Sequence, residues 1–565
     1  MISPRCFFVA PVLALLSILA TSPAAGQSTL REIGTQFTVT AEPLVPRPAE
    51  KPCLVHLFSN FQFAFFADTD QTFEFGPPAD CPGPWQKVVL EVNFSENGGI
   101  QFDRTASLYL ANANLYFGTT PEPLQTLNNI WHVERDVTDY SPLFATAQQG
   151  TMVLQNCTTD CPPPYNTFLN GIFSVNADLQ FYPLQKNSGK PAPETPDLVL
   201  PLEQPNSSGG VSLPALLSSP TQQLTTTFSL PTNVERAYLD VVSQSQSDDE
   251  QWYACFPNNL SAINELFGCG NTDFRETEVS IDGNAAGIAP VSPWVFTGFL
   301  PDQWVPIPAA QTLEFVPYRV NLTPFAALLS DGQPHTVAMS VFNDDDYFSV
   351  TGSLLLFLDK GSRQVTGALT TDTLTAPSPV ATDNLHGTTT VTGTIGVTQD
   401  RNFTIAGYVS TSHGTIETSI AGLQRFSSTS TIDFNIATDD PLDQNTSVEN
   451  SLLTTTTVSS LAGSLVTQDY FSFPITVDVT YPVDSAIFGL TVATAQNYQA
   501  DKVVSLGPVP LYFSSVTNTV NSTDVSPASS SQQYSSFDST GAAYHCQIAS
   551  ANNVLTTVSR GCRQP

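Results

Sequence analysis

Short runs in which apolar and polar residues alternate recur along almost the whole chain. A period of two is typical of strands with one buried face, and Gly, Pro, Asn and Asp separate the runs as turn residues do. After the first segment, no helical stripe is longer than about three turns. The clearest runs are Val88–Phe94, Ala106–Leu110, Phe168–Tyr182, Arg236–Val242, Thr277–Ile281, Thr336–Val341 and Ser349–Leu358. The pattern predicts an all-β protein with two jelly-roll-like antiparallel β-sandwiches.

Changes in composition divide the 565-residue chain, which is longer than one core usually supports. Residues 186–225 are rich in Pro, Ser and Gly and read as a linker with one short strand at Leu198–Leu202. Beyond residue 360 the chain becomes rich in Thr, Ser and Val, in runs that predict a third sandwich. The expected segments are a signal peptide (1–26), an extended N-terminal segment (27–50), a first sandwich (51–185), the linker (186–225), a second sandwich (226–360) and a C-terminal β-rich domain (361–565).

The first residues have the pattern of a secretory signal. Arg5 precedes the apolar run Cys6–Ala20, and small residues follow at Pro23–Gly26. No later stretch reaches the roughly 20 apolar residues that a membrane-spanning helix needs. We therefore predict a secreted protein, extracellular or lumenal, that has no membrane contact once the signal is removed.

Cysteine usage agrees with export. Of nine cysteines, Cys6 would leave with the signal, and the other eight form neighbouring pairs. We expect disulfides between neighbours, although the sequence does not fix their connectivity. These pairs are Cys53 and Cys81, Cys157 and Cys161, Cys255 and Cys269, and Cys546 and Cys562. Glycosylation sequons stand at Asn93, Asn156, Asn206, Asn259, Asn321, Asn402, Asn445 and Asn521.

The ionisable residues argue against several classes of partner. The net charge of −32 would repel nucleic acids and anionic membranes, and it favours tolerance of acidic surroundings. Neither Cys-x-x-Cys nor His-Glu-x-x-His occurs, so no metal is expected. The run Asp344–Asp346 lacks the Gly and distal Glu of a known calcium loop, so we interpret it as solvated.

The first candidate for chemistry is the pair Asp103 and Arg104. It lies where a Gly-containing loop enters the predicted strand Ala106–Leu110, a position from which side chains can reach a cleft. The competing interpretation is a local salt bridge, which is the usual role of such pairs. The residues around the pair decide between the two.

Ordered blocks around this pair resemble the peptide N-glycanases, and most closely the acidic, plant-type branch that fungi also carry. The blocks run in family order from about residue 50 to 360. They comprise PCLVHLF at 52–58, CPGPWQKVVL at 81–90, QFDR at 101–104, WHVERDVTDY at 131–140, LPTNVERAYL at 230–239, DEQWY at 249–253, FRETEVSIDG at 274–283 and LTPF at 322–325.

The resemblance implies an amidase that cleaves the bond between an Asn side chain and the first N-acetylglucosamine of an N-glycan. It also implies two sandwiches packed side by side, and it requires no cofactor. Asp103 matches the principal catalytic acid, with Arg104 keeping it ionised and oriented. Glu250 matches a second acid from the other sandwich, although by itself it reads as a solvated loop residue. Two carboxyls in different environments can divide the roles of base and acid.

The chain departs from the family pattern in two places. The bacterial type has a third acid on the strand where this chain reads Val153–Cys157; Asn156 could support the site there, unless its sequon is glycosylated. Val305 replaces the Arg that plant-type members tend to carry. Candidate sugar-stacking rings are Trp131, Trp252 and Trp304, each of which could instead be a core aromatic of a sandwich.

Three functions fit this sequence. The favoured one is a secreted glycoamidase acting on N-glycosylated peptides and proteins, which leaves Asp. A carbohydrate-binding protein without turnover and a glycosidase with paired carboxylates are the alternatives. The sequence leaves the oligomeric state and the preferred glycan open.

Overall fold

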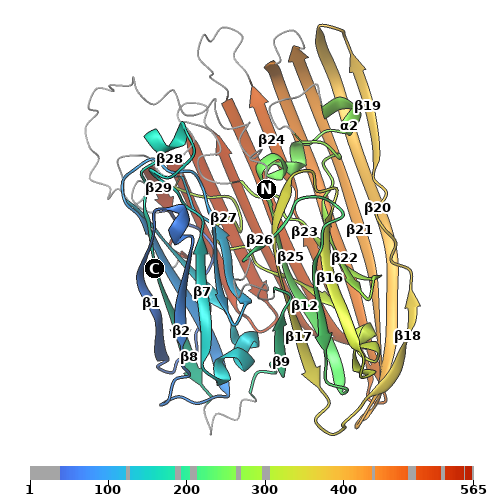
Figure 1. Ribbon diagram of the computed structural model, residues 1–565. Helices are drawn as coiled ribbons and strands as arrows, with labels where there is room; N and C mark the ends of the chain where they lie inside the picture. Colours follow the sequence, from blue (N-terminus) through green and yellow to red (C-terminus); the bar gives the residue numbers. More distant parts are fainter. Residues whose placement is uncertain are drawn as a thin grey trace.

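The computed structural model describes residues 38–122, 128–184, 192–203, 213–261, 269–295, 306–435, 440–480, 491–523, 528–552 and 554–562. The regular secondary structure of these residues is almost entirely antiparallel sheet, which confirms the all-β prediction. Figure 1 shows two sandwiches side by side, the first in blue and cyan and the second in green and yellow, with a large sheet running behind both. The predicted signal peptide lies outside the described residues.

The first sandwich consists of two four-stranded sheets. Alternate residues of each strand face the space between the sheets, where Leu, Val and Phe side chains form one core. One sheet has the order β1 (Cys53–Phe63), β8 (Phe173–Pro183), β3 (Trp85–Glu96), β6 (Asn129–Asp136). The other has the order β2 (Asp70–Phe75), β7 (Gln148–Leu154), β4 (Thr105–Leu110), β5 (Ala113–Thr119). Short 3-10 turns lie at Phe66–Asp68, Thr138–Ala145 and Tyr165–Thr167.

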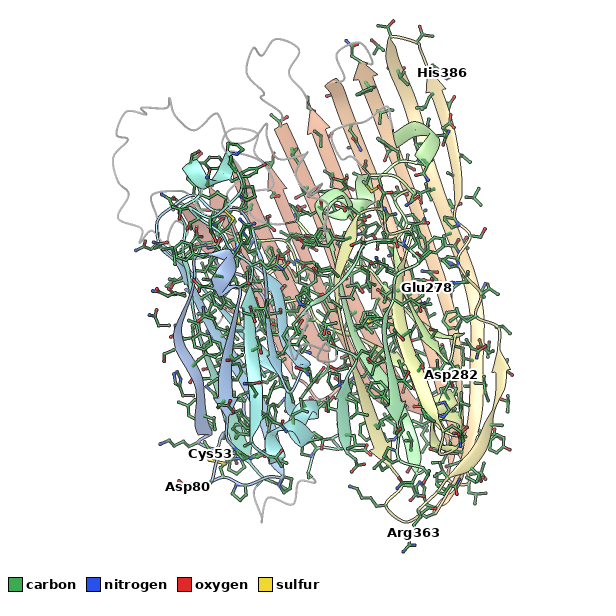
Figure 2. The ribbon with its side chains drawn as sticks, viewed as in Figure 1. Cys53, Asp80, Glu278, Asp282, Arg363 and His386 are labelled. Atoms are coloured by element: carbon green, nitrogen blue, oxygen red, sulfur yellow. A yellow bond between two sulfur atoms is a disulfide. The ribbon has the colours of Figure 1, made fainter. Side chains whose placement is uncertain are left out.

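Strand register defines two ends of this sandwich. Cys53 pairs with Phe181 at one end, whereas Phe63 and Glu96 both pair with Phe173 at the other. Figure 2 shows Cys53 and Asp80 together at the first of these ends. Because the loop after Glu96 leads into β4, Asp103 lies at the opposite end from Asp80.

The second sandwich includes strands from the segment that reads as a linker. β9 (Leu198–Pro201), where the sequence predicts a strand, and β10 (Ala215–Leu217) both pair with β17. One sheet has the order β10, β17 (Tyr347–Leu358), β12 (Val234–Gln246), β15 (Tyr318–Asn321). The other has the order β11 (Leu224–Ser229), β16 (Pro334–Phe342), β13 (Glu276–Ile281), β14 (Asn284–Pro290). The helix α2 (Asn258–Ser261) and 3-10 turns at Ser247–Asp249, Trp252–Ala254, Thr323–Phe325 and Leu328–Ser330 connect these strands.

The C-terminal strands form one 12-stranded sheet, so the expectation of a third sandwich is wrong. β20 buries nearly every second residue, as the alternating pattern predicts, but the second sandwich covers its apolar face. Phe426 on β21 packs against Phe274, with ring centroids 5.1 Å apart. The strands are β18 (Thr366–Asp372), β19 (Val380–His386), β20 (Thr390–Thr411), β21 (Gly414–Asn435), β22 (Asp440–Ser460), β23 (Gly463–Ser472), β24 (Ile475–Thr480), β25 (Thr491–Leu506), β26 (Val509–Thr523), β27 (Ser529–Asp538), β28 (Ala543–Ala551) and β29 (Val554–Val558).

The two sandwiches are joined through β12. Gln244 on that strand accepts a hydrogen bond from Thr105 Oγ1 at 2.7 Å and donates one to Thr119 Oγ1 at 2.7 Å. Nearby, Arg319 binds both Asp139 of the first sandwich and Asp240 of the second. The contacts of Gln244 fix the start of β4 against the end of β12, and both strands lead directly to candidate site residues.

All four predicted disulfides are present in the structure, in the expected neighbouring pairs. Each links two positions within one sandwich or within the large sheet. Among the described residues, no helix is both long and apolar enough to span a membrane.

Buried carboxyl groups predict that stability falls as the pH rises. Burial raises the pKa of Glu203 and Glu314 to about 8 and that of Asp273 and Glu276 to about 7. In the unfolded chain these groups ionise near pH 4, so the folded state holds more protons between about pH 4 and 8 and loses stability across that window. We expect the thermal midpoint to be about 5 °C or more lower at pH 8 than at pH 5. A midpoint that rises over this range would contradict the expectation.

Candidate active site

Asp103 is held at the mouth of the first sandwich by an extension of the hairpin between β4 and β5. The backbone N–H of Arg104 donates to Thr120 Oγ1 at 2.8 Å, and the N–H of Thr120 donates to the Arg104 carbonyl at 2.8 Å. The N–H of Asp103 donates to Glu122 Oε1 at 3.1 Å. The side chain of Asp103 is partly exposed at the end of this ladder.

Glu250 follows the short turn that ends β12. Its backbone N–H donates to the Ser247 carbonyl at 3.0 Å, and Gln251 Nε2 donates to its Oε1 at 2.6 Å. The preceding Asp249 anchors the turn, because its buried carboxylate binds Arg275 and two backbone N–H groups of the loop after β16. The partly exposed Glu250 is thus presented by a rigid support.

The structure brings these two acids together. The contacts of Gln244 and Gln246 with Thr105 align the two segments, and the carboxyls of Asp103 and Glu250 lie close enough to interact electrostatically. Burial raises the pKa of Asp103 to about 6. Burial and the charge of Asp103 raise the pKa of Glu250 well above its usual value. Glu250 therefore keeps its proton at a pH where Asp103 has lost its own, which suits one for the acid and the other for the base.

Arg104 acts more weakly on Asp103 than the sequence suggests. Its charge lowers the pKa of Asp103, but burial outweighs this effect. The guanidinium donates from Nη2 to Gln101 Oε1 at 2.9 Å and also interacts with Glu96, a fully buried acid at the end of β3. Arg104 is therefore shared among several acids instead of being dedicated to one.

Sequence reasoning missed Glu122. Burial and the charges of Asp103 and Glu250 raise the pKa of Glu122 well above its usual value, which places its carboxyl beside both acids. Glu122 lies in the segment Thr120–Glu122, which has no recognisable motif. The only signal is positional, since a hairpin between residues 105 and 119 sets the residues after 119 opposite Asp103.

A sequence profile of the family described as peptide N-acetyl-beta-D-glucosaminyl asparaginase amidase A matches residues 43–374. That range is more than half of the chain and contains Asp103, Glu122 and Glu250. The chain belongs to this family. The peptide-N4-(N-acetyl-beta-glucosaminyl)asparagine amidase A of Prunus dulcis is 30% identical over 397 residues, which are 68% of this amidase A family member and 66% of that relative. The match thus spans just under two thirds of the relative's length.

Distant likenesses to solved structures also exist. A structure of PNGF-II has a TM-score of 0.36 at 12% identity and covers 55% of this chain and 66% of its own. A structure titled peptide-N(4)-(N-acetyl-beta-D-glucosaminyl)asparagine amidase has a TM-score of 0.35 at 14% identity and covers 54% of this chain and 96% of its own. At these scores they add nothing to the family assignment.

Two of the aromatic predictions need correction in this amidase A family member. Trp252 is 0% exposed within the core of the second sandwich, and Trp131 is 4% exposed and stacked on Phe94 in the first. Neither ring has a face that a sugar can reach, because both fill space between sheets. Trp304 lies outside the described residues.

Asn156 supports the loop of Asp103 from beneath. It is buried, and its Nδ2 donates to the carbonyls of Phe63 and Gly171 at 2.8 and 3.1 Å. Gln101 Nε2 donates to the same Gly171 carbonyl, and Gln101 Oε1 accepts from Arg104. A side chain so enclosed has no room for a glycan in the folded protein.

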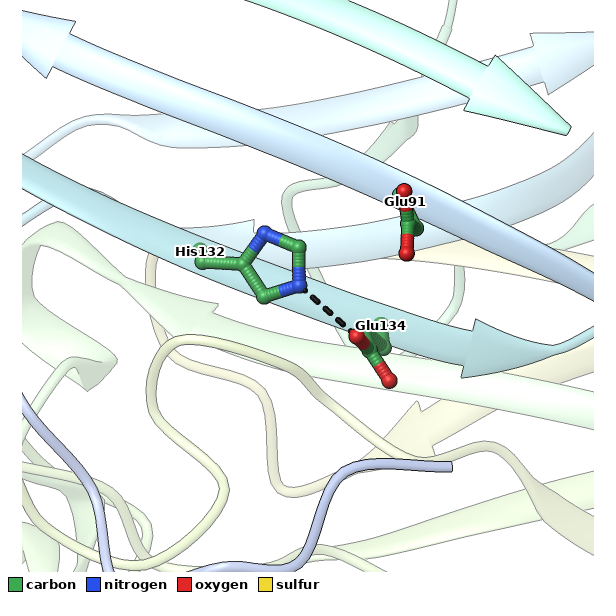
Figure 3. Close-up of side chains that lie close together, drawn as sticks. All are labelled: Glu91, His132 and Glu134. Atoms are coloured by element: carbon green, nitrogen blue, oxygen red, sulfur yellow. Dashed lines mark hydrogen bonds and ion pairs between the residues drawn. The ribbon is translucent and has the colours of Figure 1, made fainter. Parts of the chain in front are cut away.

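Within the described residues, two clusters have metal-ligand spacing. Figure 3 shows one of them, in which His132 Nε2 contacts Glu134 Oε1 at 2.9 Å and Glu91 faces the pair. The guanidinium of Arg47 already binds Glu91 at 2.6 Å and Glu134 at 2.7 Å. The other cluster comprises Glu235, Asp359 and His413. There the hydroxyl and the backbone N–H of Ser412 donate hydrogen bonds to the carboxylate of Asp359. Both clusters are satisfied by protein groups.

Proposed function

We propose that this protein is a glycoamidase that hydrolyses the amide between Asn and the first N-acetylglucosamine of N-glycans on peptides and proteins. One observation carries the proposal: two acids with separated pKa values, Asp103 and Glu250, meet where the two sandwiches join. Membership of the amidase A family supports the choice of substrate.

The reaction assigns one role to each acid. Asp103, ionised, accepts a proton from the water that attacks the amide carbon, and protonated Glu250 donates a proton to the departing nitrogen. The C–N bond breaks, Asn becomes Asp, and the glycan leaves as a glycosylamine that loses ammonia. Arg104 supplies positive charge beside the base and offers an N–H group to the developing oxyanion.

The joint between the sandwiches suits a substrate that combines a sugar and a peptide. Each half supplies one acid, and the Gln244 contacts hold them in register without occupying the carboxyls. We also propose that the chain is secreted through its first 26 residues, with which four disulfides are compatible.

Mass spectrometry of a synthetic N-glycopeptide after incubation with the enzyme tests the proposal. We expect a peptide with Asp at the former glycosylation site and, in heavy-oxygen water, one heavy oxygen in that carboxyl. A glycosidase would instead leave one N-acetylglucosamine on Asn. A binding protein would retain the glycopeptide on a column and return it intact. Either result would refute the amidase.

A further inference from the structure

We propose that the outward face of the large sheet carries N-glycans at Asn402, Asn445 and Asn521, and that the folded protein keeps them. Each of these residues begins an Asn-x-Ser/Thr sequon. The presence of the glycans rests on the proposed secretion, and their retention rests on the proposed amidase activity.

All three residues project from the side of the large sheet that faces away from the sandwiches. Asn402 on β20, Asn445 on β22 and Asn521 on β26 are exposed. Successive side chains of a strand point to opposite faces, and the residue before each Asn is buried. These buried residues are Arg401, Gln444 and Val520. Arg401 bonds to Glu276 of the second sandwich, which identifies the buried side as the one that the sandwiches cover.

Strand register places two of these residues side by side. Asn445 pairs with Asp478 on β24, and Asp478 pairs with Ala493 on β25. Ala493 in turn pairs with Thr523 on β26, which lies two residues from Asn521. Three strand spacings and two residues correspond to roughly 16 Å between the Cα atoms of Asn445 and Asn521. Glycans on these two residues would therefore cover the same part of the outward face.

The remaining sequons are placed differently. Asn156 is buried, and Nδ2, the atom that would bear the glycan, donates to two backbone carbonyls. Asn321 is partly buried at the end of β15, and its Oδ1 accepts the backbone N–H two residues further on. Asn93 and Asn259 are exposed, but on the first sandwich and on α2, and Asn206 lies outside the described residues. Because a glycan is bulky and needs solvent, only the large sheet, among the surfaces that the structure describes, combines several sequons that can carry one.

The position of the three residues within the sheet protects their glycans from removal. Each of β20, β22 and β26 is hydrogen-bonded to a strand on either side. Because an active site that encloses an Asn side chain also needs access to the flanking backbone, attack would require these ladders to open. Asp103 and Glu250 belong to the sandwiches, on the opposite side of the large sheet (Figure 1), so they cannot reach these residues of their own chain.

The first experiment measures occupancy without using the native signal or the enzyme activity. The Asp103→Asn protein is exported behind a foreign secretion signal from a eukaryotic host, and its peptides are treated with an endoglycosidase that leaves one N-acetylglucosamine on each glycosylated Asn. By mass spectrometry, we expect this sugar on Asn402, Asn445 and Asn521 and plain Asn at position 156. Plain Asn as the main species at any of the three positions would overturn the inference. Export behind the native residues 1–26, run in parallel, tests the proposed secretion on its own.

Variants that keep each Asn but destroy its sequon provide a matched set. Thr404→Ala, Ser447→Ala and Thr523→Ala should each reduce the mass of the exported protein by one glycan. Thr429→Ala is the control, because Thr429 is exposed on the outward face of β21 and belongs to no sequon. The control should keep all of its glycans. A sequon variant whose glycan content equals that of the control would refute the site in question.

Incubation with added wild-type enzyme tests retention. The glycosylated Asp103→Asn protein serves as the substrate in two forms, one folded and one digested with a broad-specificity protease after heat unfolding. We expect Asp at the three positions only in the digested sample, since only there can the Asn side chains enter the joint between the sandwiches. Asp at these positions in the folded sample would show that the sheet gives no protection. Intact glycans in both samples would refute the amidase activity, and the retention with it, but not the occupancy.

Discussion

Replacing Asp103 with Asn should reduce kcat/KM for N-glycopeptide hydrolysis by about 10³-fold or more. An amide cannot accept the proton of the attacking water, and general bases contribute about 10² to 10⁴-fold. Loss of the negative charge also lowers the pKa of Glu250, so a smaller fraction of Glu250 keeps the proton that it must donate. Release of Asp-containing peptide, followed by mass spectrometry, measures the effect.

The Asp103→Asn variant should lose activity without losing thermal stability. Asn keeps the size of Asp103 and removes a carboxyl whose pKa burial raises, so the thermal midpoint at pH 8 should be unchanged or slightly higher. Asp80→Asn is the control, since Asp80 is exposed at the opposite end of the same sandwich and should retain full activity. If the Asp103→Asn protein kept more than about a tenth of wild-type activity, Asp103 could not be the general base.

Local patterns predicted the strands well because alternation reports directly on a half-buried sheet. The same patterns do not say what lies against the buried face. The outward polar residues of β20 and β21 fit a third sandwich as well as one broad sheet, and the deciding contact, Phe426 on Phe274, joins distant segments. The linker composition likewise hid β10, and the pairing of β9 and β10 with β17 is a tertiary property.

The candidate site shows a similar limit. Asp103 and Glu250 could be paired only through the resemblance, because nothing local indicates that the start of β4 meets the end of β12. Glu122 has no motif, and its position beside Asp103 follows from hairpin register. Trp252 is a candidate for sugar stacking that lies two residues from Glu250, yet burial of a large apolar ring outweighs that proximity.

The sequence predicts solvent exposure wrongly for the acidic residues beneath Glu250. Asp344 was expected in solvent, but it is 0% exposed, and burial together with Asp249 raises its pKa to about 8. Asp249 and Arg275 are also fully buried. Acidic composition suggested solvation, whereas the fold uses these carboxyls to tie the turn of Glu250 to the loop after β16.

Replacing Asp249 with Ala should therefore destabilise the protein by about 3–5 kcal/mol, because the buried cation of Arg275 loses its partner. Asp249 Oδ1 accepts from Arg275 Nε and Nη2 at 2.9 and 2.7 Å, and Oδ2 accepts the backbone N–H groups of Asp345 and Asp346 at 2.7 and 2.8 Å. We expect a large fall in the thermal midpoint and a loss of activity in the protein that remains folded, since Glu250 loses its anchor.

Two further variants distinguish loss of the Asp249 anchor from a general loss of stability. Glu276→Ala breaks another buried pair, with Arg401, between the second sandwich and the large sheet, and should lower the midpoint but spare the activity of folded protein. The double variant Asp249→Leu with Arg275→Met should recover much of the stability, because it leaves no unpaired charge. Its activity should stay low, since two backbone N–H groups still lack the carboxylate that positions the turn. Full activity in this double variant would show that Glu250 is placed by β12 alone.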